Sequence, residues 1–465
     1  MKALKNIYQL LNEKFNYSQM KKVKLLVAVC AGILTGNIVT AQETLTLQQA
    51  LKFAIEHKAE AQKARLEVEN AQYLIDEVKG SALPQVNGSG TLTYNPMLQK
   101  SALPGEIIGK PGETVMVAFG QKWQSNAVLS VNQQLFNQSI VTGLKAARTT
   151  KEFYQINKTL TDEQLIEKVA DAYYQVFQLQ QQLQTVQTNL DNTTKTQSII
   201  SGLVDAGLSK KIDLDRLVVT VNNLEAAKQQ MVNSLQLSEN ALKFAIGMEM
   251  DKDIILPAET FEVNAAILAD QPDVLNRTEI KLLSVQSDLL QLNKKAKAAE
   301  YYPSLSFTGN LGYLGMGPYF PVFNNSSKVN WSGFSGLGLN LSIPIFNGGT
   351  TKAKINQANI DIKKLDVEIN DTKLALALAS ENARSQINNS LLTVNTNKRN
   401  ISLAKDVLDN TQNNYKNGLA TLTDLLDAEK AYADAQNNLT ISLLSYKVAE
   451  IQLIKANGNL KSLLN

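Results

Sequence analysis

Cysteine and histidine are nearly absent from this sequence of 465 residues, and their scarcity excludes several kinds of site. The only cysteine is Cys30, and the only histidine, His57, lies in a charged segment where a solvated side chain is expected. A disulfide or a thiolate metal site needs at least two cysteines, and a histidine-based metal site needs more than one histidine. We therefore expect no metal and no cofactor. Asp, Glu and Ser are abundant enough for a carboxylate enzyme on spacing alone, but no concave scaffold is evident, so we expect no enzymatic activity.

Long apolar runs are also absent after residue 41, so no later segment is expected to cross a membrane as a helix. Before that point, a basic stretch over 20–24 is followed by an apolar stretch over 25–34 and the small-residue sequence Val39-Thr40-Ala41. This order predicts a signal peptide over residues 1–41, with Met20 as an alternative start, and an exported bacterial protein. A cytoplasmic basic amphipathic arm is the alternative for residues 1–24.

Excess positive charge is missing from the mature chain. The whole sequence has 46 Lys and Arg against 43 Asp and Glu, but six of these basic residues and one acidic residue belong to residues 1–41, which leaves a mature net charge of −2. A nucleic-acid partner requires a basic surface, so we expect none.

Proline and aromatic residues are scarce as well. All ten prolines lie outside 112–256 and 345–465, and Gly143 to Gly202 has no glycine between them. A helix over this last segment would extend about 90 Å at 1.5 Å per residue. With only 6% aromatic residues, such helices are expected to pack through small side chains.

A seven-residue period marks the segments that follow these long helices. In the second of them, apolar residues recur at every seventh position with Ala or Ser three residues later. The first also has apolar residues at every seventh position except Lys228, but the residues three positions later are Leu217, Leu224, Met231, Ser238 and Ala245. The second series is Leu425, Tyr432, Leu439, Tyr446, Leu453 and Leu460. A sustained heptad predicts coiled-coil packing.

The second half of the chain repeats the first. Gly207-Leu208 recurs as Gly418-Leu419 and Asp213 as Asp424, at a shift of 211 residues. This predicts two repeats, 42–247 and 274–465, each with a helix, two strands, a long helix and a return helix. Residues 248–273 interrupt the repeat with acidic residues and two prolines and are interpreted as an equatorial linker.

Four segments of about ten residues alternate between apolar and Ser, Thr or Asn side chains. They are 84–95, 127–135, 305–313 and 337–345, and Trp123 and Trp331 lie beside the second strand of each repeat. Transmembrane β-strands have this length and pattern, although the strands of a soluble sandwich also alternate. The glycines at 333, 336 and 338 lie in this pattern and lack the Gly-Lys-Ser/Thr of a phosphate loop.

Four strands are too few to close a barrel, and open edges in lipid leave backbone groups unpaired. The chain must therefore oligomerise if these strands span a membrane. Eight strands from two copies give a barrel filled by its own side chains, whereas twelve strands from three copies leave an open bore.

Three recurring features carry a family resemblance. A proline precedes the first strand of each repeat, Phe136-Asn137 and Phe346-Asn347 join strand to helix, and each Gly-Leu turn is followed by Asp. Over residues 42–465 the chain resembles the TolC-like outer-membrane efflux family. The resemblance implies a mainly α-helical homotrimer with a membrane part, in which a 12-stranded β-barrel in the outer membrane continues into the periplasm as a coiled-coil α-helical barrel.

The resemblance also implies a function. The protein would be the outer-membrane channel of a tripartite efflux or type I secretion system, a passive exit duct in contact with outer-membrane lipid. A periplasmic adaptor (membrane fusion) protein and an inner-membrane pump would recruit it. A soluble periplasmic coiled-coil adaptor or structural spacer is the alternative.

Family members carry a pair of aspartates at the channel entrance, and Asp424 and Asp427 match that pair. Tyr415 and Asp213 match an entrance lock between helices, but Ala420 stands where the family example has Arg, so the lock is absent or built differently. An Asp pair at this spacing can also be a solvated helix face, and Tyr415 can be a packed interfacial residue.

The two Gly-Leu pairs, Gly207-Leu208 and Gly418-Leu419, correspond to the helix-hairpin tips on which the family's adaptors dock. Glycine is needed in such turns in any case, because a tight turn between helices requires a positive φ. The two leucines are more informative, since an exposed apolar side chain at a tip indicates a partner.

Overall fold

The structure is a computed structural model that describes residues 44–109, 111–257, 276–321 and 328–464. The chain divides into two units. In the small unit, residues 44–46 and 253–257 are described, and the Leu45 amide donates a hydrogen bond to the Ile255 carbonyl at 2.7 Å. The large unit contains all of the helices and strands named below. The predicted leader and most of the predicted linker lie outside the described residues.

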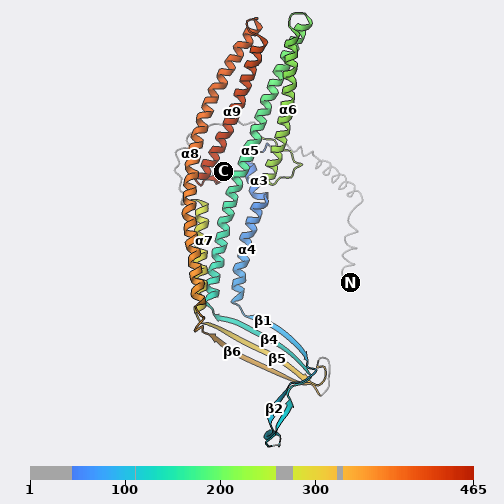
Figure 1. Ribbon diagram of the computed structural model, residues 1–465, viewed down its shortest axis with the longest axis vertical. Helices are drawn as coiled ribbons and strands as arrows, with labels where there is room; N and C mark the ends of the chain where they lie inside the picture. The colour runs from blue at the N-terminus through green and yellow to red at the C-terminus, as the bar shows by residue number, and fades with distance from the viewer. Residues whose placement is uncertain (1–43, 110, 258–275, 322–327, 465) are drawn as a thin grey trace, which may run out of the picture. The chain divides into compact units, whose positions relative to one another are not determined.

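Two long helices dominate the large unit. They are α5 (Gln138–Asp205) and α8 (Thr350–Lys416), and each packs against a return helix, α6 (Lys211–Ile246) or α9 (Leu422–Ala456) (Figure 1). The prediction of one uninterrupted helix over 143–202 is confirmed. Proline-free sequence and helix-compatible side chains allow this length, and packing against the partner helix stabilises it.

The predicted heptads lie at the contact between long and return helices. Tyr446 and Leu453 of α9 are 1% exposed and pack with Ile387 and Val394 of α8. Ala383, Ala449 and Ala456 complete this core, so small side chains bring the two helix backbones close together.

Three shorter helices precede the strands. They are α3 (Leu47–His57) and α4 (Ala59–Ser81) in the first repeat and α7 (Thr278–Ala298) in the second. A single helix was expected in the first repeat, but Lys58 has an extended conformation (φ −65°, ψ 134°) and separates α3 from α4. Among the described helices, none combines the length and the apolar character needed to cross a bilayer.

All four predicted strands are present and form one antiparallel sheet in the order β1-β4-β5-β6. Their bounds are β1 (Gln85–Tyr94), β4 (Trp123–Phe136), β5 (Ser304–Gly317) and β6 (Asn330–Ser342). The β4–β5 pairing joins the two repeats, and β1 and β6 form the edges. The last strand begins seven residues before the predicted 337 and ends before Pro344, which cannot donate a backbone hydrogen bond.

A small hairpin was not predicted. It consists of β2 (Lys100–Pro104) and β3 (Thr114–Ala118), joined through the 3₁₀ helix η1 (Gly105–Ile108), and it lies between β1 and β4 in sequence. Prolines and glycines surround the strands of this hairpin, and such residues favour turns and loops. Its strands are five residues long, too short for alternation to be recognised.

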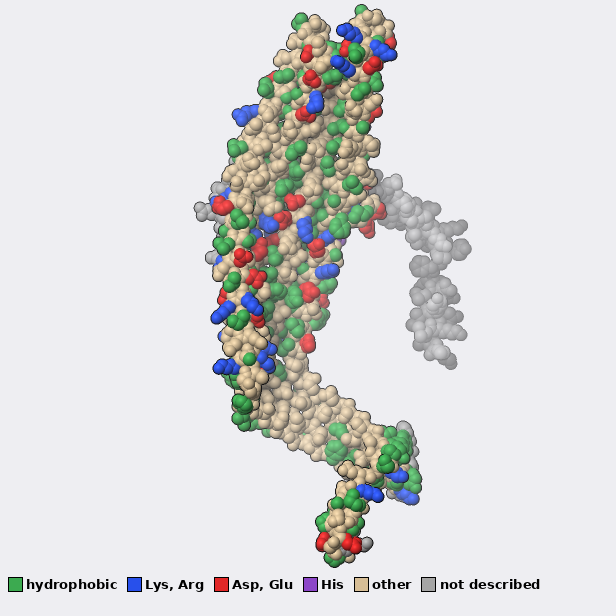
Figure 2. Space-filling view, in the orientation of Figure 1, with side chains coloured by type: hydrophobic (Ala, Val, Ile, Leu, Met, Phe, Trp, Pro, Cys, Tyr) green, Lys and Arg blue, Asp and Glu red, His purple; other side chains and the backbone are tan. Residues whose placement is uncertain are grey.

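The four-stranded sheet contains no charged residue. Figure 2 shows charged side chains spread over the helices and none on the visible face of these strands. The pairing register places apolar side chains such as Val86, Leu129, Leu311 and Leu337 on one face. The opposite face is mainly Ser, Thr, Asn and Gln.

Aromatic side chains gather at the end of the sheet remote from the helices. Tyr94 pairs with Trp123, with ring centroids 4.6 Å apart, and Tyr313 stacks on Trp331 at 5.4 Å. Both tryptophans thus lie inside β4 and β6 rather than beside them. An aromatic cluster at one end of an uncharged sheet is typical of a membrane boundary.

Each return helix ends against a buried cation. The Lys58 Nζ atom donates to the Phe244 carbonyl of α6 and lies 3.6 Å from the centre of the Phe244 ring. At the corresponding place in the second repeat, the Arg277 Nη1 atom donates to the Ala456 carbonyl of α9 at 3.0 Å. Lys58 immediately precedes α4, and Arg277 immediately precedes α7. These hydrogen bonds therefore join the start of α4 to the end of α6 and the start of α7 to the end of α9.

Candidate functional site

The two helix-hairpin tips have the same backbone geometry. Gly207 and Gly418 adopt φ values of +75° and +74°, a conformation that other residues rarely adopt. The amides of Leu208 and Leu419 donate to the carbonyls of Leu203 and Asn414, at 2.7 and 2.8 Å. These bonds close the ends of α5 and α8 as Schellman-type caps.

The leucines of these caps are unusually exposed. In a Schellman cap, an apolar residue after the glycine commonly packs back on the helix. Here Leu208 is 76% exposed and Leu419 is 78% exposed. Two equivalent apolar side chains therefore extend from the tips without a partner in the described chain.

Next to the tips, the two helical hairpins share an apolar cluster. Ile200 of α5, Leu217 of α6, and Leu422 and Leu425 of α9 are buried together, and Tyr415 of α8 packs against them. Burial raises the pKa of the Tyr415 hydroxyl, and the negative charge of Asp213 raises it further. The structure thus brings the predicted pair Tyr415 and Asp213 near each other while also giving Tyr415 a packing role.

Asp424 closes the first turn of α9. Its Oδ2 atom accepts hydrogen bonds from the Thr421 amide at 2.8 Å and the Thr421 hydroxyl at 2.7 Å, while the Thr421 hydroxyl accepts from the Asp424 amide. This capping box pairs backbone groups that the helix itself leaves unpaired. The Thr421 hydroxyl and then its amide lower the pKa of Asp424, which remains ionised at neutral pH.

Asp427 lies one turn further along α9 and is exposed. It lines a groove of about 500 Å³ formed by α5, α6 and α9. Glu429 lies in the same groove, where burial raises the pKa of its carboxyl group. The two predicted aspartates therefore have different surroundings, since Asp424 bonds to its own helix terminus and Asp427 faces open space.

Sequence reasoning missed one cross-link between the hairpins. The Arg216 Nη1 atom of α6 donates to the Thr423 hydroxyl of α9 at 2.8 Å, next to the predicted entrance residues. No local motif signals a contact between residues 207 positions apart. The repeat offers one indication, since the 211-residue shift places Arg216 in register with Asp427. This bond joins α6 to α9 in a chain that has Ala420 in place of the family example's Arg.

The helix α8 has two apolar faces. One is buried against α9 and α7, whereas the other is an exposed stripe whose members recur at intervals of seven, four, fourteen or eleven residues. The stripe consists of Ile360, Val367, Leu374, Leu378, Leu392, Leu403 and Val407. At about 100° per residue these positions lie within roughly 60° of one another on the helix. Such a stripe requires a second partner.

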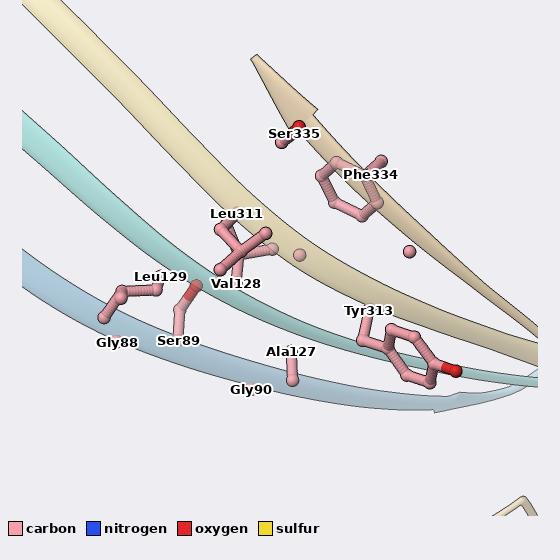
Figure 3. Close-up of a pocket in the computed structure, with 12 residues that line it drawn as sticks. Gly88, Ser89, Gly90, Ala127, Val128, Leu129, Leu311, Tyr313, Phe334 and Ser335 are labelled. Atoms are coloured by element: carbon pink, nitrogen blue, oxygen red, sulfur yellow. The ribbon is translucent and has the colours of Figure 1, made fainter. Parts of the chain in front are cut away.

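The sheet has a hollow of about 820 Å³ beside Leu129, Leu311 and Tyr313, and residues of both faces contribute to its lining (Figure 3). Small residues form much of its lining, namely Gly88, Gly90, Ala127 and Gly333. The hollow contains no charged side chain. The apolar face of the uncharged sheet is suited to contact with lipid acyl chains.

Comparison with known proteins agrees with this architecture. The family model described as outer membrane efflux protein matches residues 50–248 and 275–459. The outer membrane efflux protein BepC of Brucella suis is 24% identical over 454 residues, which cover 96% of this chain and 92% of BepC. The outer membrane protein TolC of Vibrio cholerae is 23% identical over 346 residues, 72% of this chain and 77% of that protein.

The fold of the chain is also that of a solved structure. The outer membrane protein VceC from Vibrio cholerae has a TM-score of 0.68 to this chain at 18% identity, with 89% of this chain and 96% of VceC covered. The predicted fold class is thereby confirmed for the single chain. Because the family model spans both repeats of strands and helices, this protein belongs to the outer membrane efflux protein family.

Proposed function

We propose that three copies of this chain form a passive exit duct in the outer membrane. The open, uncharged sheet carries the proposal, because β1 and β6 are edge strands and all residues of β6 are exposed. In lipid, each edge must pair with another strand. Pairing β6 of one copy with β1 of the next closes a ring, and twelve strands leave an open bore.

The helices support the same closure. The stripe on α8 has a counterpart on the first repeat, where α6 exposes Ile212, Val219, Leu237 and Phe244 along one face. A contact between two different surfaces of one chain is heterologous and generates rings. The helical part then continues the barrel into the periplasm, so that the ring of strands and the ring of helices share one axis.

The duct has no energy source of its own. Its partners are a periplasmic adaptor protein and an inner-membrane pump, which together make it the outer component of a tripartite efflux or type I secretion system. BepC is named as an outer membrane efflux protein, and TolC is named as an outer membrane protein. Residues 1–41 serve as the signal peptide in this proposal, 42–247 and 274–465 are the two repeats, and 248–273 link them at the equator.

The entrance residues provide the test of this function. In planar bilayers the purified protein should conduct ions, and divalent cations should block it, because three copies converge six carboxylates from Asp424 and Asp427. Asp424→Asn with Asp427→Asn should raise the half-blocking concentration of Ca²⁺ by about tenfold. Absence of conductance, together with recovery of the mature chain as a soluble periplasmic protein, would favour the adaptor or spacer alternative.

Thr421→Ala is the matched control, since it breaks the capping box and keeps both carboxylates. It should lower the thermal stability of the protein and leave the Ca²⁺ block unchanged. Because the folded state lowers the pKa of Asp424, the stabilisation by the capping box depends on pH. It is present above the pKa that Asp424 has in the unfolded chain, and it is lost as the pH falls through the pKa of Asp424 in the folded protein. Unchanged block in the double Asn variant would remove these aspartates from the entrance.

The tips should dock the adaptor. Leu208→Ser with Leu419→Ser retains both turn glycines, so the turns, the trimer and the single-channel conductance should persist. Export of a fluorescent dye from cells and cross-linking to the adaptor should both fall to the level of a strain without the protein, because the exposed leucines are the apolar anchors of the contact. Ala206→Ser, in the same turn, is the control. Normal export by the double variant would contradict docking through these leucines.

A further inference from the structure

Phe334 interrupts the pattern of the sheet. The even-numbered residues of β6, which include Asn340 and Ser342, lie on the polar face. Phe334 is one of these residues. Every other aromatic residue of β1, β4, β5 and β6 lies on the apolar face by the same register. Contact with lipid therefore explains those side chains but not Phe334, whose ring is 40% exposed.

The structure holds the Phe334 ring in a defined place. Phe334 pairs with Gly312 of β5, and a Cβ atom on Gly312 would lie 2.2–2.7 Å from three atoms of the ring. The ring therefore lies directly on the glycine, in space that any other residue would fill. Val128 of β4 pairs with Gly312 on its other side, which places a second apolar side chain in the same row (Figure 3).

Cross-strand packing alone could explain an aromatic ring over a glycine, and the sheet contains a matched example. Trp331 of β6 lies over Gly315 of β5, with ring atoms 2.9 Å from the position of a Cβ atom. That pair is on the apolar face, where Trp331 also stacks on Tyr313. The two pairs share the same strands and similar packing, and they differ in the face to which they belong.

We infer that Phe334 forms an aromatic contact site for apolar or aromatic small molecules inside the barrel. This inference rests on the proposed trimeric duct, whose three copies place three Phe334 rings at one height in a bore that is lined mainly by polar side chains and also by Val128, Leu314 and Met316. An exposed ring face binds other aromatic rings and organic cations. Molecules in transit would thus contact an apolar ring on a face that is otherwise mainly polar.

The test compares two cations of equal charge, tetraphenylphosphonium and tetraethylammonium, as blockers of single-channel conductance. Both cations should interact with the entrance carboxylates. The difference between their half-blocking concentrations therefore reports the aromatic contact. In the unmodified protein, tetraphenylphosphonium should block at a concentration about tenfold lower. Phe334→Ala should remove this difference, and Phe334→Leu should remove most of it while still covering Gly312. Trp331→Leu, the control on the opposite face, should leave it unchanged.

Orientation can be tested separately, because Cys30 is the only cysteine and lies in the predicted leader. A charged, water-soluble methanethiosulfonate reagent should reduce the conductance of Phe334→Cys and not that of Trp331→Cys. If Phe334→Cys conducts and does not react, or if Phe334→Leu keeps the full preference for tetraphenylphosphonium, the inference is wrong. The proposed function as a duct is not affected by either result. If the unmodified protein forms no channel, the proposed function fails first.

Discussion

Replacing Leu374 and Leu378 of α8 by Asp should abolish the trimer. Both side chains belong to the exposed stripe, at 72% and 62% exposure in the single chain, opposite the face that packs on α9. In the proposed ring this stripe is buried against the neighbouring copy, where each leucine contributes about 2 kcal/mol. Six leucines per trimer thus contribute about 12 kcal/mol, and six buried, unpaired carboxylates would oppose association further.

The measurement is the mass of the purified protein in mild detergent, by mass photometry or analytical ultracentrifugation. Ala375→Asp with Ala379→Asp is the matched control, because both alanines are exposed, lie in the same turns and would carry the same added charge one residue away from the stripe. This control should remain trimeric. A trimer of normal stability in the leucine variant would show that the stripe faces something other than a second copy.

Patterns within a single element predicted most of this fold. Alternation located all four long strands, and the absence of proline and interior glycine located α5 and α8, because both signals report which side chains one local conformation can bury. The turn glycines Gly207 and Gly418 were predicted from the repeat and the family resemblance, because a tight turn between helices requires a positive φ. The β2–β3 hairpin was missed because strands of five residues give too little alternation.

Contacts between distant residues were beyond this kind of reasoning. The Arg216 to Thr423 bond and the Arg277 to Ala456 bond join residues about 200 positions apart, and either arginine could equally have been a solvated surface residue. Phe334 shows a different limit. The predicted last strand began at residue 337, since two glycines and a phenylalanine out of phase obscured the alternation before it. The exception to the pattern became visible only when the register with β5 was known.

Replacing Arg277 by Met should destabilise the second repeat by about 3 kcal/mol. The side chain is 6% exposed, and its guanidinium group bonds to both carboxylate oxygens of Glu279 and to the Ala456 carbonyl at the end of α9. Met fills much of the volume but leaves a partly buried carboxylate without its cation and a helix-terminal carbonyl without its donor. The midpoint of thermal unfolding in detergent should fall by roughly 5 °C.

Two further variants separate charge from packing. Arg277→Lys keeps the charge but has no planar fork for the two oxygens of Glu279, so its loss should be intermediate. Arg277→Met with Glu279→Leu removes both members of the pair and should recover much of the stability lost by Arg277→Met, because no charge is then left unpaired. Lys58→Met should have a smaller effect in the first repeat, where one ammonium group bonds to one carbonyl. If the double variant is as unstable as Arg277→Met alone, the bond to the Ala456 carbonyl, rather than the ion pair, stabilises this junction.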